Sequence, residues 1–236
     1  SELDNDALEP GGTKFYVVDQ SRQRTFKYDA TGNTLDSNLL NEEEETPRGI
    51  AASPDGSTLW VVDQKGEVFV YSNENELLGS WEIDGVDKPE GITVHGDDLW
   101  LVDRGEDRVY LFEGGALKRS GEAEPTSSFK LARRNRNPMG LVTDGTSVWV
   151  VNSGRTDKVF RYTTDGTPEG NWKLDTANAR PTGLTIDPND VNHIWIVDSR
   201  SDRVFQYDGA VERISGSQMA SSSFALAGTN RNPQGI

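Results

Sequence analysis

Five apolar runs of this sequence end in the same pattern, and their spacing limits what the chain can fold into. In each run an aromatic residue stands three positions before an acid or an amide. The five aromatic residues are Tyr16, Trp60, Trp100, Trp149 and Trp195. They follow one another at intervals of 44, 40, 49 and 46 residues. A repeat of this length is typical of a unit of four β-strands, and it exceeds the ~33 residues of common helical repeats.

Three further runs accompany each aromatic run in a fixed order. A Pro-x-Gly segment precedes it, as in PRGIAA, PEGITV, PMGLVT, PTGLTI and the terminal PQGI. An alternating run follows it, as in RTFKYD, EVFVYS, RVYLFE, KVFRYT and RVFQYD, and SNLL, SWEI, SFKL, NWKL or SFAL closes the unit. Segments rich in Gly, Asn and Asp separate several of the runs, as tight turns between antiparallel strands require. We therefore predict an all-β chain that folds as a β-propeller of four-stranded antiparallel blades.

The order of these motifs resembles that of the NHL-repeat β-propellers. The resemblance rests on the Pro-x-Gly segment, the aromatic-apolar-Val-Asp run and the Arg-Val-Phe-x-Tyr run, and it covers nearly the whole chain. That family is typically six-bladed, whereas about five repeats are visible here. Its active relatives, gluconolactonase-type hydrolases and streptogramin lyases, depend on a polar, metal-binding or histidine-bearing channel.

We expect one propeller domain over residues 1–236, with five blades. The blades are placed near residues 12–40 with 233–236, 47–83, 89–131, 138–174 and 181–227. Residues 233–236 are expected to close the ring by pairing with residues 14–19, because aligning Ala7–Pro10 with Ala51–Pro54 brings the two ends into register. The alternative is a fragment of a six-bladed ring or of a longer array. An offset of 95 residues, as between Asp103 and Asp198, hints at a two-blade unit.

Charge and composition exclude several classes of function. The chain has 24 Lys and Arg against 39 Asp and Glu, a net charge of −15. We expect no nucleic-acid partner, because binding to a phosphate backbone needs clustered cations. The apolar runs are much shorter than the ~18 residues of a membrane span, so we expect no membrane insertion. The chain has no cysteine, which excludes thiolate chemistry and cysteine-based metal sites.

We predict no catalytic residue, no metal site and no cofactor. The two histidines, His95 and His193, are expected on the face that bears the turns between first and second strands. An acid or amide recurs at Asp19, Asp63, Asp103, Asn152 and Asp198. We interpret this set as structural, each member accepting loop amides or pairing with the basic residue opposite, rather than as a calcium site. A metal-dependent lactonase-type or lyase-type enzyme is the alternative function.

Of the six tryptophans, Trp81 and Trp172 lie in fourth, outer strands. We expect the tryptophans in general to pack between blades. These two are the exceptions that we expect to be most available for stacking against a ligand.

The candidate binding site lies on the face formed by the loops that lead into the first strands. The residues that follow the prolines are expected around the central opening: Arg48, Glu90, Met139, Thr182 and Gln234. The same loops carry an acidic run, NEEEET, and five arginines: Arg133, Arg134, Arg136, Arg180 and Arg231. Arginine suits bidentate recognition of carboxylates. We therefore predict a binding or scaffold module of an extracellular or cell-envelope bacterial protein, with a protein or an acidic polysaccharide as partner.

Overall fold

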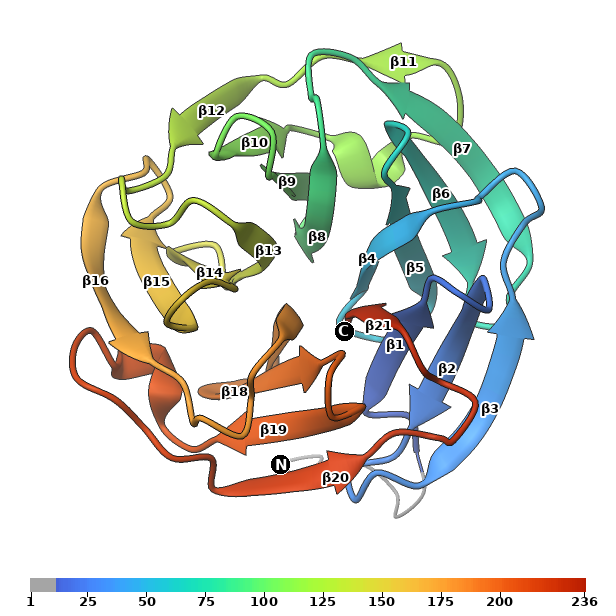
Figure 1. Cartoon of the computed structure of the whole chain (residues 1–236). Helices are drawn as coiled ribbons and strands as arrows, with labels where there is room; N and C mark the ends of the chain where they lie inside the picture. The colour runs from blue at the N-terminus through green and yellow to red at the C-terminus, as the bar shows by residue number, and fades with distance from the viewer. Residues whose placement is uncertain (1–11) are drawn as a thin grey trace, which may run out of the picture.

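The computed structural model describes residues 12–236, which form a ring of five β-sheets around a central axis (Figure 1). In each sheet four strands run antiparallel from the axis outward. The predicted all-β, five-bladed propeller is therefore confirmed. Within these residues no helix is long and apolar enough to cross a membrane.

The first three blades, with strands named from the axis outward, come from residues 15–130 and the end of the chain. Blade 1 consists of β21 (Pro233–Gly235), β1 (Phe15–Asp19), β2 (Arg24–Tyr28) and β3 (Thr34–Leu39). Blade 2 consists of β4 (Pro47–Ala52), β5 (Thr58–Asp63), β6 (Glu67–Ser72) and β7 (Leu77–Ile83), and β11 (Glu122–Ala123) is added at its outer edge. Blade 3 consists of β8 (Pro89–His95), β9 (Asp98–Asp103), β10 (Arg108–Phe112) and β12 (Ser127–Lys130).

Blades 4 and 5 complete the ring. Blade 4 consists of β13 (Pro138–Thr143), β14 (Ser147–Asn152), β15 (Lys158–Thr163) and β16 (Pro168–Lys173). Blade 5 consists of β17 (Pro181–Asp187), β18 (Asp190–Asp198), β19 (Arg203–Tyr207) and β20 (Ser222–Ala225). Two short 3₁₀ helices, η1 (Gly115–Leu117) and η2 (Ala210–Glu212), follow the third strands of blades 3 and 5.

The ring closes where the end of the chain meets its first described strand. Strand β21 pairs with β1 through Val18 opposite Gly235 and Asp19 opposite Pro233, so the predicted closure is confirmed. The Asp19 carboxylate also accepts a hydrogen bond from the backbone N–H of Asn232, over 2.7 Å. The expected alignment of Ala7–Pro10 with blade 2 lies outside the described residues.

One glycine from each Pro-x-Gly segment lies at the axis: Gly49, Gly91, Gly140, Gly183 and Gly235. A Cβ added to Gly91 would stand 2.7 Å from the Cα of Gly140, closer than real Cβ atoms approach another atom. A Cβ added to Gly235 would likewise stand 2.8 Å from the Cα of Gly49. The last and first glycines of the set are thus in the same contact as glycines of consecutive blades, and the ring has no place for a sixth blade.

Apolar clusters fill the spaces between neighbouring blades. Between blades 2 and 3, Trp60 and Trp81 pack with Leu99 and Phe112. The continuous apolar runs of the second strands are explained by this arrangement, because both faces of each such strand are covered by other sheets.

Blades 3 and 5 carry insertions between their third and fourth strands, and these cover the outer strands of the preceding blades. Strand β11 pairs in parallel with β7, and Lys173 of β16 forms a parallel bridge with Ser217. Trp81 and Trp172 are therefore only 1% exposed. Our expectation that these two tryptophans face a ligand is wrong, because each ring packs between blades, against the third strand and the insertion of the next blade. Blades 2 and 3 form one interlocked pair and blades 4 and 5 another, which explains the 95-residue offset.

Candidate functional site

The acids repeated at the ends of the second strands hold the loops of one face, which we call the upper face. This face is made by residues 41–46, 84–88, 132–137, 175–180 and 227–232, which lead into the inner strands, together with the loops between second and third strands. Asp198 accepts backbone hydrogen bonds from Arg180 over 2.6 Å, from Arg200 over 2.9 Å and from Ser201 over 2.8 Å. Asp63 and Asp103 accept backbone N–H groups in the same way, and Asn152 accepts one from Asn137. These residues are structural, as predicted.

The arginines opposite these acids do not contact the carboxylates but donate to serine hydroxyls of the fourth strands. Arg203 faces Asp198 in the strand register, but its guanidinium donates to the hydroxyl of Ser223 in the fourth strand over 3.0 Å. Arg108 donates in the same way to Ser128 over 3.0 Å. Of the two predicted alternatives, the loop amides are therefore the partners of these acids, and no ion pair with the opposite basic residue occurs within the described residues.

The five residues predicted around the central opening are brought together at the upper end of the axis. Arg48 donates to the side-chain oxygens of Gln234, over 3.1 Å, and of Gln64, over 2.8 Å. Gln64 in turn donates to Glu90 over 3.3 Å, and Arg104 forms an ion pair with Glu90 over 3.4 Å. Burial raises the pKa of Glu90, while the charges of Arg48 and Arg104 act in the opposite direction.

Most of this ring is covered. Glu90 is 1% exposed, Thr182 3%, Gln234 6% and Met139 9%. The Thr182 hydroxyl donates to the carbonyl of Pro233 over 2.8 Å. Arg48 is the member of the predicted ring that is partly exposed. The axis therefore offers a partner one cation and a small polar surface.

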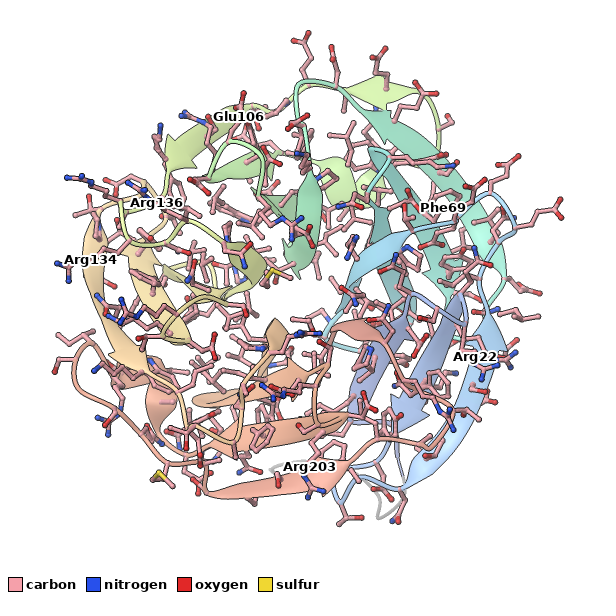
Figure 2. All side chains as sticks on the ribbon, viewed as in Figure 1. Arg22, Phe69, Glu106, Arg134, Arg136 and Arg203 are labelled. Carbon is pink, nitrogen blue, oxygen red and sulfur yellow. The ribbon has the colours of Figure 1, made fainter. Side chains whose placement is uncertain are left out.

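The five arginines predicted on the loops of blades 4, 5 and 1 are all exposed: Arg133, Arg134, Arg136, Arg180 and Arg231. Within the described residues none of them lies within ion-pair distance of a carboxylate. Arg136 and Arg231 each donate Nε to a carbonyl three residues earlier, over 2.8 and 2.9 Å, which leaves their terminal nitrogens free. Figure 2 shows Arg134 and Arg136 toward the outer edge of the ring, away from the central opening. We call these five residues the arginine arc.

The acidic loop of blade 2 is less exposed than its sequence indicates. Glu42 and Glu43 are exposed, and Glu45 forms an ion pair with Lys65 over 2.6 Å. Glu44, however, is fully buried and accepts a hydrogen bond from the hydroxyl of Tyr71 over 2.7 Å. Sequence reasoning missed this role, although Glu44 stands three residues before a proline, where blades 4, 5 and 1 have a buried asparagine.

The opposite face, which we call the lower face, carries the turns between inner and second strands. His95 ends β8 and His193 lies in β18, both at this face as predicted. Nδ1 of His193 accepts a hydrogen bond from the backbone N–H of Gly209 over 3.2 Å. In residues 12–236 no group of three or more His, Asp or Glu residues is placed to hold a metal ion.

A cavity of about 380 Å³ opens on this lower face, along the axis. Its walls come from all five blades, and sequence reasoning did not find it. A cavity is space that side chains leave empty, and neither a motif nor a spacing in the sequence signals it.

Comparisons with known proteins identify the fold. A chain in the crystal structure of a nidogen/laminin complex is similar, with a TM-score of 0.57 and 14% identity, over 95% of this chain and 97% of that one. No family model matches the sequence, and no curated protein sequence shows significant similarity to it. At this identity the likeness shows the β-propeller fold, and the NHL-repeat family remains a prediction.

Proposed function

We propose that this propeller is a non-enzymatic binding module whose partner docks on the upper face, against the arginine arc. The observation that carries this proposal is the set of five exposed arginines that have no carboxylate partner among residues 12–236, on a chain of net charge −15. Folding alone does not require such a set, because the repeated acids already hold the loops. An exposed arginine without a partner is free to form bidentate contacts with carboxylates of another molecule.

The shape of the face favours a protein partner. Its centre is filled by the network of Arg48, Gln64, Glu90 and Gln234, and the space between the axial glycines beneath this network holds only about 10 Å³. Arginine is enriched at protein interfaces relative to the rest of the protein surface, so the arginine arc fits a protein partner. The similar chain comes from a complex of two proteins, which is in keeping with this proposal. We infer an acidic protein surface as the partner, and an extracellular or cell-envelope setting.

The test uses poly-L-glutamate as an acidic polypeptide and polygalacturonate as an acidic polysaccharide, with binding measured by calorimetry at low and raised salt. Replacing Arg133, Arg134 and Arg136 by Ser should weaken binding to poly-L-glutamate by roughly tenfold, because each exposed pair contributes up to about 1 kcal/mol. Added salt should reduce the difference between wild type and variant.

The matched control replaces three cations outside the upper face, Lys27, Lys118 and Arg213, by Ser, which changes the net charge equally. Its affinity should stay near that of the wild type. An equal loss of affinity for poly-L-glutamate in both triple variants would show that net charge, and not the arginine arc, determines binding. Binding to polygalacturonate but not to poly-L-glutamate would instead indicate that the partner of the arginine arc is a polysaccharide.

A further inference from the structure

The cavity on the lower face has an apolar floor with one aliphatic side chain from each blade. These are Ile50, Ile92, Leu141, Leu184 and Ile236, and each directly follows a glycine of the axial ring. The volume of about 380 Å³ lies in the range of pockets that enclose small ligands.

The axial glycines close this cavity at its inner end. The space between their backbones holds only about 10 Å³, room for about one water molecule. A ligand in the cavity therefore reaches it from the lower face and cannot pass through to the upper face. The cavity is separate from the proposed partner surface.

Among residues 12–236, three charged side chains line the mouth, and their charges nearly balance. Lys14 forms an ion pair with Asp187 and lies over the ring of Trp195, 5.2 Å from its centroid. The third charged residue is Asp55. Its pKa is lowered to about 2 by hydrogen bonds from Ser53 and Ser57, so it remains an anion at neutral pH. The mouth thus has a slight negative charge, which disfavours anionic ligands.

In the part of the chain that the structure describes, one of the three threonines that line the walls next to the floor has a free hydroxyl. Thr143 donates its hydroxyl to the carbonyl of Ser147 over 2.7 Å, and Thr185 contacts the carbonyl of Ile186 over 3.4 Å. The hydroxyl of Thr93, which also lines the cavity, has no hydrogen-bond partner among residues 12–236. It can bind a hydroxyl or carbonyl of a ligand.

From this geometry we propose that the cavity binds a small, uncharged, largely apolar molecule that carries one hydroxyl or carbonyl group. The apolar body lies against the five aliphatic side chains of the floor, and the polar group meets Thr93. A carboxylate in place of the hydroxyl would lose its hydration without gaining a cationic partner, because Lys14 is already paired with Asp187.

The test uses N-phenyl-1-naphthylamine, a neutral fluorescent probe, with the full chain. The probe should gain fluorescence on binding. Decan-1-ol should displace it at a concentration at least about tenfold lower than decanoate, since the two differ in the charge of the head group. The Thr93→Val variant should retain the probe but bind decan-1-ol a few-fold more weakly, because one hydrogen bond is lost.

Two filling variants, Thr185→Phe and Ala52→Phe, place an aromatic ring in the cavity from different blades and should each abolish displaceable binding. Circular dichroism verifies that they fold. Thr34→Phe, the same change on the exposed face of β3, is the matched control and should bind normally.

Three results would overturn the proposal. The first is that the full chain does not bind the probe. The second is equal displacement by decan-1-ol and decanoate. The third is unchanged binding in both filling variants, which would place the probe on exposed leucines such as Leu39.

Discussion

The hydroxyl of Tyr71 donates a hydrogen bond to Oε2 of Glu44 over 2.7 Å, and both side chains are buried. In blades 4, 5 and 1 an asparagine replaces the glutamate and donates instead to the tyrosine, as Asn135 does to Tyr162 over 3.1 Å. Blade 2 thus keeps the contact but replaces a neutral amide with an ionisable acid. Burial, followed by the nearby charges of Asp63 and Glu67, raises the pKa of Glu44 to about 8, although the bond from Tyr71 opposes this.

This acid makes the stability of the fold depend on pH. The folded protein holds the Glu44 proton up to a pKa of about 8, whereas the unfolded chain releases it near the ordinary value of 4.5. Between these values the folded state binds more protons, so the free energy of unfolding falls as pH rises. The stability that depends on protonated Glu44 is fully present below about pH 4.5, and it is lost by about pH 8.

Glu44→Gln should therefore stabilise the fold, and more so as pH rises. Relative to wild type, the free energy of unfolding should increase by about 1.4 kcal/mol per pH unit between pH 5 and pH 8, a few kcal/mol in all. Urea unfolding at several pH values measures this difference. Glu42→Gln, an exposed residue of the same loop, should change little at any pH. A constant difference between Glu44→Gln and wild type would show that Glu44 titrates normally.

The axial glycines leave no room for a Cβ, so replacing one of them should destabilise the fold strongly. Gly91→Ala should lower the free energy of unfolding by at least about 2 kcal/mol, because its Cβ would stand 2.7 Å from the Cα of Gly140 and neither backbone can move without opening the ring. Gly228→Ala is the control, since nothing lies within 4 Å of an added Cβ there. Chemical unfolding of both variants compares them. Equal stabilities would mean that the blades are packed less closely at the axis.

The structural acids give a third prediction. Asp198 accepts hydrogen bonds with both carboxylate oxygens, Oδ2 from Arg180 and Oδ1 from Arg200 and Ser201. Asp198→Asn replaces one acceptor by a donor, so one loop amide loses its partner, at a cost of about 1 to 3 kcal/mol. Asp208→Asn, on the exposed lower face, should cost much less. Thermal unfolding measures the difference, and similar melting temperatures for the two variants would argue against the structural role.

The fold could be predicted from sequence because each blade repeats the same strand pattern and the Pro-x-Gly segment marks each inner strand. The positions of the arginines followed from strand direction, since loops entering the inner strands share one face. Trp81 could not be placed correctly, because nothing near it in the sequence shows that residues from blade 3 cover it. Glu44 belongs to a run of four glutamates, a pattern typical of a solvated loop. Only the contact with Tyr71 shows that it is buried.

The outer strands provide a last prediction, because the insertions need glycine where they cross β7 and β16. A Cβ added to Gly79 would stand 2.1 Å from the carbonyl oxygen of Arg119, and φ at Gly79 is +155°, which other residues rarely adopt. Gly79→Ala should therefore displace the insertion of blade 3 and expose Trp81. We expect a red shift of tryptophan fluorescence and faster tryptic cleavage after Arg119, with a loss of roughly 2 kcal/mol in stability.

The matched control is Asp36→Ala in β3, which occupies the position of Gly79 in the strand register but has no insertion over it. Its fluorescence and its rate of cleavage after Arg119 should equal those of the wild type. A charged residue on an open edge strand also deters pairing with another chain. Asp36→Ala should consequently self-associate more readily in sedimentation experiments, whereas Gly79→Ala should differ from wild type in fluorescence, cleavage and stability. If Gly79→Ala is cleaved no faster than wild type, the insertion of blade 3 does not need a glycine where it crosses β7.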